Sequence, residues 1–310
     1  MKEKLSSEDY QSSLFIILPI LYIILAFTIF TYPLNPLIIA FLPIPLFLGL
    51  IFLIMGSFLK NQRNGSRIRM IGWMVFSAYW ATQPQTLYFA EQQDLINALI
   101  CIIGIFVLCY FAYREWFSLK TDDYEASLQW IAGASALAGF IYFLFELTPL
   151  STILIDIVAV QSGLLLNLFT GEVIVNPPFL AYKTAYIRII FACTAVQSMV
   201  IFIGMILPLP NVELKRKVQG ILITVVPVYF LNLIRNALIT YLVGIYGNDF
   251  FSIAHNYIGK GGSLLALIVI LFFVVKYVPE VFDHILALTD LPKKQGPIER
   301  MLSKILRRNS

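Results

Sequence analysis

Long apolar stretches alternate with short polar segments along most of the chain. Eight of these stretches approach or exceed the roughly 17–25 residues that a helix needs to cross a bilayer. They are residues 14–32, 37–59, 70–90, 95–117, 128–147, 186–209, 218–243 and 263–282. The third stretch is the weakest, because Gln83, Pro84 and Gln85 interrupt it. The pattern predicts an all-α fold, a polytopic membrane helix bundle with about eight transmembrane helices.

A further apolar block covers residues 150–170 and carries several polar side chains. These are Asp156, Gln161, Ser162 and Asn167. Such a mixture suits an interfacial or re-entrant helix better than a span. We therefore expect a single integral membrane domain over residues 1–291, followed by a basic cytoplasmic tail over residues 292–310.

Charge predicts the orientation of these spans. Only 13% of the 310 residues are charged and 59% are hydrophobic, far from the composition of a soluble domain. Seventeen lysines and arginines fall in the segments on the side of both termini, whereas the segments on the other side hold Lys183 and Lys260. Positive loops stay in the cytoplasm, so both termini are predicted to be cytoplasmic. The first apolar run lacks a small-residue cleavage site and is expected to be retained.

Several chemistries are excluded by composition and motif. The net charge of +4 is spread between the spans rather than over one face, so no nucleic-acid partner is expected. Two histidines, no H-E-x-x-H motif and scattered carboxylates argue against a zinc site, and no cofactor is expected. The segment VQSG at 160–163 lacks the first glycine of a serine nucleophile elbow.

Arg235 lies in the middle of the apolar run 218–243. A charged side chain there costs about 2.5–3.5 kcal/mol on insertion scales. A structural ion pair, snorkelling of the side chain to the membrane surface, or a catalytic role would each explain this charge. In the predicted topology Cys193 and Arg235 lie roughly 10 Å and 12 Å below the outer boundary, at 1.5 Å per residue. His255 falls in the next external loop, whereas His284 falls on the cytoplasmic side.

All three cysteines, Cys101, Cys109 and Cys193, fall in predicted helices, so an external disulfide framework is not supported. Cys101 reaches the same outer depth as Cys193, but its neighbours are apolar. Gln197, four residues after Cys193, shares its face of a predicted helix. This polar stripe indicates a wet or protein-lined cavity.

Further polar side chains accompany Arg235 and His255. Asn232 lies three residues before Arg235, on the same helix face. Asn256 follows His255 directly. Lys260 is close enough in sequence to take the place of His255 in the candidate site. Gln197, Asn232 and Asn256 are therefore candidate substrate-binding residues.

Together these residues suit acyl transfer. A cysteine attacks as the thiolate, which a nearby cation stabilises. A guanidinium stays charged and can also hold the oxyanion of a tetrahedral intermediate. An imidazole can pass a proton to and from the leaving amine.

Three motifs carry a resemblance to a known family. The segments ACTAVQSMVIFIG around Cys193, LIRNALITYLVG around Arg235 and FSIAHNYIGKGGS around His255 resemble the exosortase/archaeosortase family. The match covers mainly the last 125 residues. It implies an archaeal membrane cysteine transpeptidase in which Cys193 is the nucleophile. Arg235 would stabilise the thiolate and oxyanion, and His255 or Lys260 would act as acid and base.

The same resemblance implies the partners. The substrates would be surface proteins with a C-terminal sorting signal of the PGF-CTERM type: a Pro-Gly-Phe motif, an apolar helix and a basic tail. The enzyme would cleave near the motif through a thioester and transfer the new carboxyl end to an amino-bearing membrane lipid. The active site is expected on the extracytoplasmic side of the membrane.

The sequence leaves two other functional classes open. A transporter or channel would use Arg235 and Lys276 as substrate or counter-ion groups, with helices broken near Pro84 or Pro227 as its best support. A non-catalytic membrane scaffold is the other. Substitution of Cys193 by alanine separates both from an enzyme.

Overall fold

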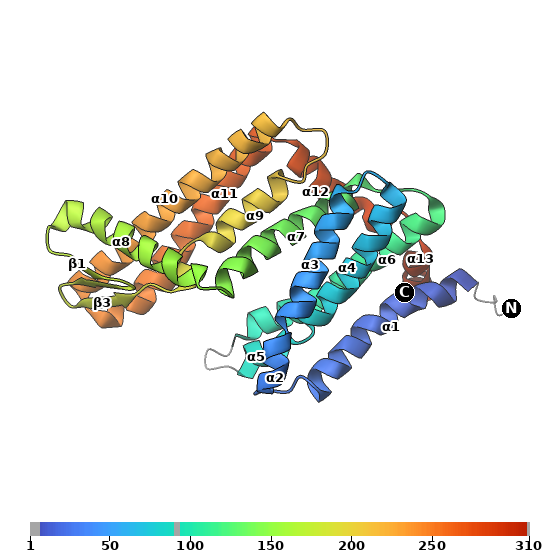
Figure 1. The fold of residues 1–310 in the computed structure, drawn as a ribbon, viewed down its shortest axis with the longest axis horizontal. Coiled ribbons are helices and arrows are strands. Elements are labelled where there is room, and N and C mark those ends of the chain that lie inside the picture. Colours follow the sequence, from blue (N-terminus) through green and yellow to red (C-terminus); the bar gives the residue numbers. More distant parts are fainter. Residues whose placement is uncertain (1–6, 90–93, 309–310) are drawn as a thin grey trace. The chain divides into compact units, whose positions relative to one another are not determined.

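A computed structural model of the chain describes residues 7–89 and 94–308. The chain divides into two compact units. The first unit runs to Ala136 and resumes at Asp283, and the second covers Leu137–Phe282. Helices make up most of both (Figure 1).

The first unit is built from helices that lie side by side (Figure 1). They are α1 (Ser7–Thr28), α2 (Pro36–Phe41), α3 (Pro43–Phe58), α4 (Gln62–Trp80), α5 (Gln83–Phe89), α6 (Leu95–Thr121), the first half of α7 (Ala126–Glu146), most of α12 (Glu280–Asp290), a 3₁₀ turn (Leu291–Lys293) and α13 (Pro297–Arg308).

The second unit combines helices with a small sheet. It contains the rest of α7, α8 (Leu150–Thr170), β1 (Ile174–Asn176), β2 (Phe179–Tyr182), β3 (Ala185–Arg188), a 3₁₀ turn (Phe191–Cys193), α9 (Val196–Ile206), α10 (Leu214–Tyr246), a second 3₁₀ turn (Asn248–Phe250), a π-helical segment (Ile253–Gly259), α11 (Lys260–Tyr277) and the start of α12.

Seven segments of the described chain are long and apolar enough to cross a bilayer. They are Gln11–Thr28, Pro36–Phe58, Leu95–Thr121, Ala126–Glu146, Leu150–Thr170, Leu214–Tyr246 and Asn248–Tyr277. Their outer faces expose large apolar side chains, among them Ile103 (62%), Leu168 (81%) and Phe272 (71%). An exposed apolar belt of this kind is the surface that lipid tails solvate. The all-α helix bundle predicted from the sequence is confirmed.

The spans differ from the predicted set in three places. The stretch 70–90 is divided between α4 and α5 and is absent from the seven. The block 150–170 is one continuous helix, α8, and is among them. The last span begins well before residue 263, because a turn and a π-helical segment lead directly into α11.

The prediction of a continuous span over 186–209 was wrong. Its first part is strand β3, followed by the 3₁₀ turn that ends at Cys193, and only the 11 residues of α9 are helical. Strand β3 pairs antiparallel with β2, in a register that sets Phe179 opposite Arg188. Apolar residues suit either state, and this pairing decides between them. Cys193 therefore lies at a corner before a helix, not within one.

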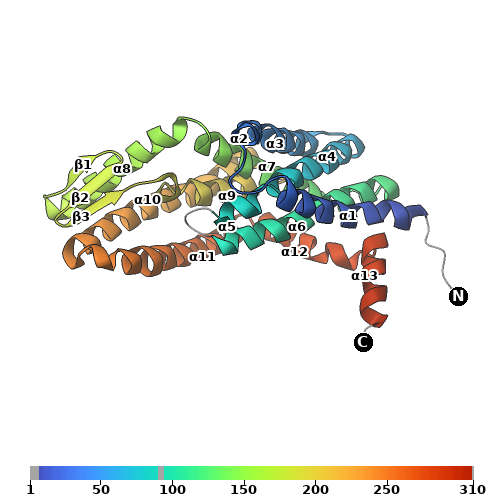
Figure 2. The ribbon, with the colours of Figure 1, turned by 90° about the horizontal axis from the view of Figure 1, so that it is seen from below.

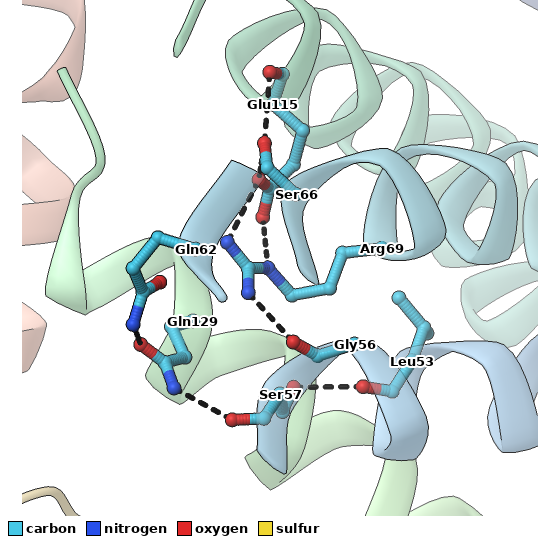
Figure 3. Close-up of polar contacts among 8 residues, drawn as sticks. All are labelled: Leu53, Gly56, Ser57, Gln62, Ser66, Arg69, Glu115 and Gln129. Atoms are coloured by element: carbon cyan, nitrogen blue, oxygen red, sulfur yellow. Dashed lines mark hydrogen bonds and ion pairs between the residues drawn. The ribbon is translucent and has the colours of Figure 1, made fainter. Parts of the chain in front are cut away.

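A buried ion pair joins helices of the first unit. Arg69 of α4 and Glu115 of α6 approach to 2.6 Å, and their side chains are 1% and 0% exposed. Ser66 Oγ donates to Glu115 Oε2 at 2.6 Å, and Arg69 Nη1 donates to the carbonyl oxygen of Gly56 on α3 at 2.8 Å (Figure 3). These bonds satisfy two charges that would be costly to bury alone, so they tie α3, α4 and α6 together.

A carboxylate of the C-terminal helix makes several contacts with α6 of the first unit. Glu299 of α13 accepts hydrogen bonds from Tyr110 and Tyr113 of α6, both at 2.8 Å, and pairs with Arg114 at 3.3 Å. Figure 2 shows α13 running in a different direction from α1 and α6. The described part of the basic tail is therefore largely an ordered helix.

The sheet of the second unit packs beside α8 and α10 (Figure 2). Its strands are antiparallel in the order β1-β2-β3. Tyr182 of β2 lies so close to α10 that a Cβ added to Gly244 would be 2.4 Å from its ring. Glycine at this position lets the strand approach the helix. The sheet thereby holds the segment after β3 against α10.

Candidate active site

Cys193 occupies the corner between β3 and α9. Its backbone N–H donates to the carbonyl oxygen of Ile190 at 2.8 Å, which closes the 3₁₀ turn. Its partly buried side chain packs against a core cluster that includes Val158 and Leu233. A helix N-terminus carries partial positive charge, and α9 begins three residues later, at Val196. The corner is therefore a favourable place for an anion.

The two residues after Cys193 make the corner sharp. Thr194 is fully buried, and its hydroxyl donates to the carbonyl oxygen of Phe191 at 2.7 Å. Ala195 adopts a left-handed conformation with φ of 60°, which is uncommon for a residue with a Cβ. Such strain persists only where neighbouring contacts hold it. The turn is thus fixed in an otherwise unfavourable backbone conformation.

Helix α10 presents three polar residues on the side facing this corner. Asn232 and Asn236 both donate through Nδ2 to the carbonyl oxygen of Cys193, at 2.7 Å and 3.0 Å. Arg235 lies between them in sequence and is half-buried. Within the described residues its buried Nε has no hydrogen-bond partner, and no carboxylate forms an ion pair with it. The structural ion pair considered above is not seen there.

His255 comes from the π-helical segment Ile253–Gly259. Its ring stacks on that of Phe251, with centroids 5.3 Å apart and an interplanar angle of 14°. His255 is therefore oriented by an aromatic neighbour, and it lines the same cavity as the cations Arg235 and Lys260.

These groups line one cavity of about 450 Å³ within the second unit. Its polar lining includes Cys193, Gln197, Asn232, Arg235, His255 and Lys260. The rest of the wall is mainly apolar, and much of it comes from α10 and α11. Such a lining suits a peptide or lipid substrate with few polar groups.

The cavity includes most of the residues singled out in the sequence. Gln197 lines it from α9, although Cys193 precedes that helix and the predicted shared helical face does not exist. Asn256 does not line the cavity, and its Nδ2 donates to Ser252 Oγ at 3.4 Å. His255 and Lys260 both line it, so both candidates for the third group remain in place.

The other two cysteines lie in α6 of the first unit. Cys101 is partly buried, and Cys109 is buried with its thiol 3.6 Å from Ser77 Oγ. Neither lines the cavity. Among the three thiols, Cys193 is the one found in the cavity with a guanidinium and an imidazole.

Metal chemistry has no obvious ligand set in the described residues. Over 7–89 and 94–308, no group of three or more histidine, cysteine, aspartate or glutamate side chains could hold a metal ion. The side chains that line the cavity are therefore the groups to consider for the chemistry of the site.

Comparison with known proteins decides the family. The family model described as transmembrane exosortase matches residues 40–274, about three quarters of the chain and all of the cavity-lining segments. The chain belongs to the transmembrane exosortase family. This confirms the family resemblance inferred from the three motifs around Cys193, Arg235 and His255.

Two curated relatives of this exosortase-family chain are named archaeosortase A. The protein from Haloferax volcanii is 24% identical over 265 residues, covering 73% of this chain and 85% of the relative. The protein from Natronomonas pharaonis is 23% identical over 262 residues, covering 74% and 81%. No solved structure matches the chain. Seven segments within residues 7–89 and 94–308 are apolar and long enough to cross a bilayer, and together with the family they show that the protein is a multi-pass membrane protein.

Three features of the exosortase site were missed in the sequence. Asn236 could have been found, because it lies four residues after Asn232 on one helical face. The left-handed Ala195 has no sequence signal, since alanine rarely adopts this conformation. Gly259 is the third: a Cβ added there would lie 3.1 Å from Arg235 Nε.

Proposed function

We propose that this chain is a membrane cysteine transpeptidase whose nucleophile is Cys193. The observation that carries the proposal is a single cavity with Cys193, Arg235 and His255 in its wall. These residues come from three segments that are well separated in sequence. A thiol, a permanent cation and a titratable imidazole are the set that acyl transfer to cysteine requires.

In the first step His255 takes the proton of the Cys193 thiol, the thiolate adds to a substrate carbonyl carbon, and the carbonyl oxygen becomes an oxyanion. Arg235 stabilises the thiolate and then the oxyanion, because its guanidinium group belongs to the cavity wall and forms no ion pair with a described carboxylate. The C–N bond then breaks, and the leaving amine takes a proton from His255. The products are a thioester on Cys193 and the released C-terminal segment.

In the second step an amine acceptor attacks the thioester. His255 takes the proton from this amine, the C–S bond breaks, and the Cys193 thiolate is restored. One amide is exchanged for another, so the cycle consumes no oxidant and needs no cofactor. Lys260 lines the same cavity and is the alternative to His255 as proton carrier.

The substrate follows from the family and from the apolar wall. We propose a surface protein with a PGF-CTERM type signal, whose apolar helix crosses the membrane beside the second unit. Residues such as Ile234, Leu238 and Leu267 give the cavity a lining compatible with that segment. The acceptor would be an amino-bearing membrane lipid. In the set of eight spans predicted from the sequence, the 17-to-2 distribution of cations supports cytoplasmic termini and a cavity that opens to the extracytoplasmic side.

The test is the intact mass of a tagged surface protein that carries such a signal, purified from cells that express either the wild type or Cys193→Ala. The wild type is expected to remove the C-terminal segment and add the mass of a lipid, whereas Cys193→Ala leaves the protein at full length. Cys101→Ala is the matched control and should process normally. Normal processing by Cys193→Ala would contradict the proposal and favour a transporter or scaffold.

A further inference from the structure

The carbonyl oxygen of Cys193 receives two side-chain hydrogen bonds from one helix. Asn232 and Asn236 lie one turn apart on α10 and are 6% and 4% exposed. Their Nδ2 atoms donate to the same oxygen at 2.7 Å and 3.0 Å. Because that oxygen accepts both bonds, each amide must present its nitrogen to it. Two buried amides are thus committed to one backbone atom of the nucleophile.

The bonds on either side of the Cys193 Cα act together. The N–H of Cys193 is held by the Ile190 carbonyl at 2.8 Å, and its C=O is held by the two amides. Each peptide unit is planar, so fixing both planes fixes φ and ψ of the residue between them. The direction of the Cα–Cβ bond then follows, and only the χ1 rotamer remains for the thiol.

The corner needs such external support. Ala195 holds a left-handed backbone two residues later, and the hydrogen bonds of Thr194 with Phe191 and Val196 lie within the turn itself. Arg235 is on the same helix, between the two asparagines. Helix α10 therefore supplies both the cation and the bonds that orient the nucleophile, which couples the two positions through one rigid element.

We propose that Asn232 and Asn236 are positioning residues, a two-amide clamp on the Cys193 carbonyl that fixes how Cys193 presents its thiol. This inference rests on the proposed function, and it changes the role of Asn232 from substrate binding to orientation of the nucleophile. The clamp acts through the backbone of Cys193, because the Nδ2 of each amide donates to its carbonyl oxygen.

The test uses Asn232→Leu, Asn236→Leu and the double variant in the full-length protein. Leucine has the same number and branching of side-chain heavy atoms as asparagine but donates no hydrogen bond. Thr240→Ala is the matched control, because Thr240 is buried on the same helix and its hydroxyl bonds to the α10 carbonyl of Asn236. kcat and KM are measured with a peptide that carries the Pro-Gly-Phe motif and its apolar helix.

Each single variant keeps one donor on the carbonyl, so we expect kcat to fall by about three- to tenfold, as for the loss of one hydrogen bond. The double variant should lose about 100-fold or more in kcat, because small misplacements of a reacting group cost that much. KM should stay within about twofold, since the substrate contacts remain. The combined loss should exceed the product of the single losses, as expected for residues that share a partner.

Other results would overturn the clamp. A raised KM with unchanged kcat would return Asn232 to substrate binding, and a double variant with nearly wild-type kcat would remove the role of both amides. Should the double variant fail to fold, Asn236→Leu alone decides: a folded single variant with unchanged kcat contradicts the proposal.

A second readout separates the clamp from the proposed function. The rate at which iodoacetamide alkylates Cys193 is measured in a background of Cys101→Ala and Cys109→Ala, with no substrate present. The double variant should react more slowly, because its thiolate is no longer held in place, while Thr240→Ala reacts normally. An unchanged rate contradicts the clamp. Normal processing by Cys193→Ala contradicts the proposed function instead.

Discussion

The buried Nε of Arg235 lies against the backbone of Gly259. A Cβ added to Gly259 would be 3.1 Å from that nitrogen and 2.9 Å from Ile239 Cδ1. The π-helical segment that carries His255 thus ends on the guanidinium side chain. Gly259 sets how closely this segment approaches α10, and with it the position of Arg235 in the cavity.

Gly259→Ala should therefore displace Arg235. Overpacking of this kind costs about 1–3 kcal/mol of stability, and a shifted cation should lower the processing rate by about 100-fold. Gly261→Ala is the control, because a Cβ there meets no described atom within 4 Å. The processing rate and the thermal midpoint in detergent are measured for both. Equal activity of the two variants would show that the approach at Gly259 is not needed.

Arg235→Lys should be much less active although it keeps the charge. A guanidinium offers a planar fork of donors, whereas an ammonium is a strongly hydrated point charge. Loss of one oriented oxyanion donor typically costs about 2.7–4 kcal/mol, or roughly 100- to 1,000-fold in rate. Processing is measured in membranes with protein levels matched by immunoblot. Lys276→Arg, at an exposed position of α11, should have no effect.

The result for Arg235→Lys also separates its possible roles. Nearly wild-type activity would mean that positive charge alone is sufficient. Loss of the folded protein would instead identify Arg235 as a structural residue, and would contradict the catalytic role proposed from its place in the cavity.

The orientation can be tested by labelling. Asn248, exposed in the turn after α10, should lie outside the cell, and Glu213, exposed just before α10, should lie inside. Each is changed to cysteine in a background that lacks the three native thiols. An impermeant maleimide should label Asn248→Cys in intact cells and Glu213→Cys only after lysis. The reverse pattern would place the cavity on the cytoplasmic side.

Glu115→Ala should destabilise the first unit. It would leave the Arg69 guanidinium, 1% exposed, without its carboxylate, and breaking a buried pair in this way costs about 3–5 kcal/mol. Glu280→Ala is the matched control, because its pair with Arg216 is 38% and 33% exposed and exposed pairs contribute less than about 1 kcal/mol. Thermal midpoints in detergent compare the two. Equal losses would refute a special role for the buried pair.

Hydrophobic periodicity predicted the helices that depend least on tertiary contacts. The long apolar runs at 95–117 and 218–243 became α6 and α10, because a helix satisfies its own backbone hydrogen bonds and depends least on partners. Pro227 does not break α10, so that support for a transporter is absent from this helix. Pro84 does follow the break between α4 and α5.

The segment around Cys193 could not be predicted in the same way. Its apolar residues are compatible with a strand or a helix, and pairing of β3 with β2 decides between them. Cys193 and Arg235 line one cavity, but the span over 186–209 that was used to compare their depths does not exist. The clamp was not predicted. Hydrogen bonds from Asn232 and Asn236 to a backbone carbonyl cannot be inferred from residue spacing when the conformation of the turn is unknown.

The most direct measurement is a search for the covalent intermediate. The purified protein is incubated with a peptide that carries the Pro-Gly-Phe motif and its apolar helix, without an amine acceptor, and is analysed by mass spectrometry. The predicted result is an acyl adduct on Cys193 that hydroxylamine releases and that Cys193→Ala lacks. An adduct on another residue, or peptide cleavage by Cys193→Ala at the wild-type rate, would contradict Cys193 as the nucleophile.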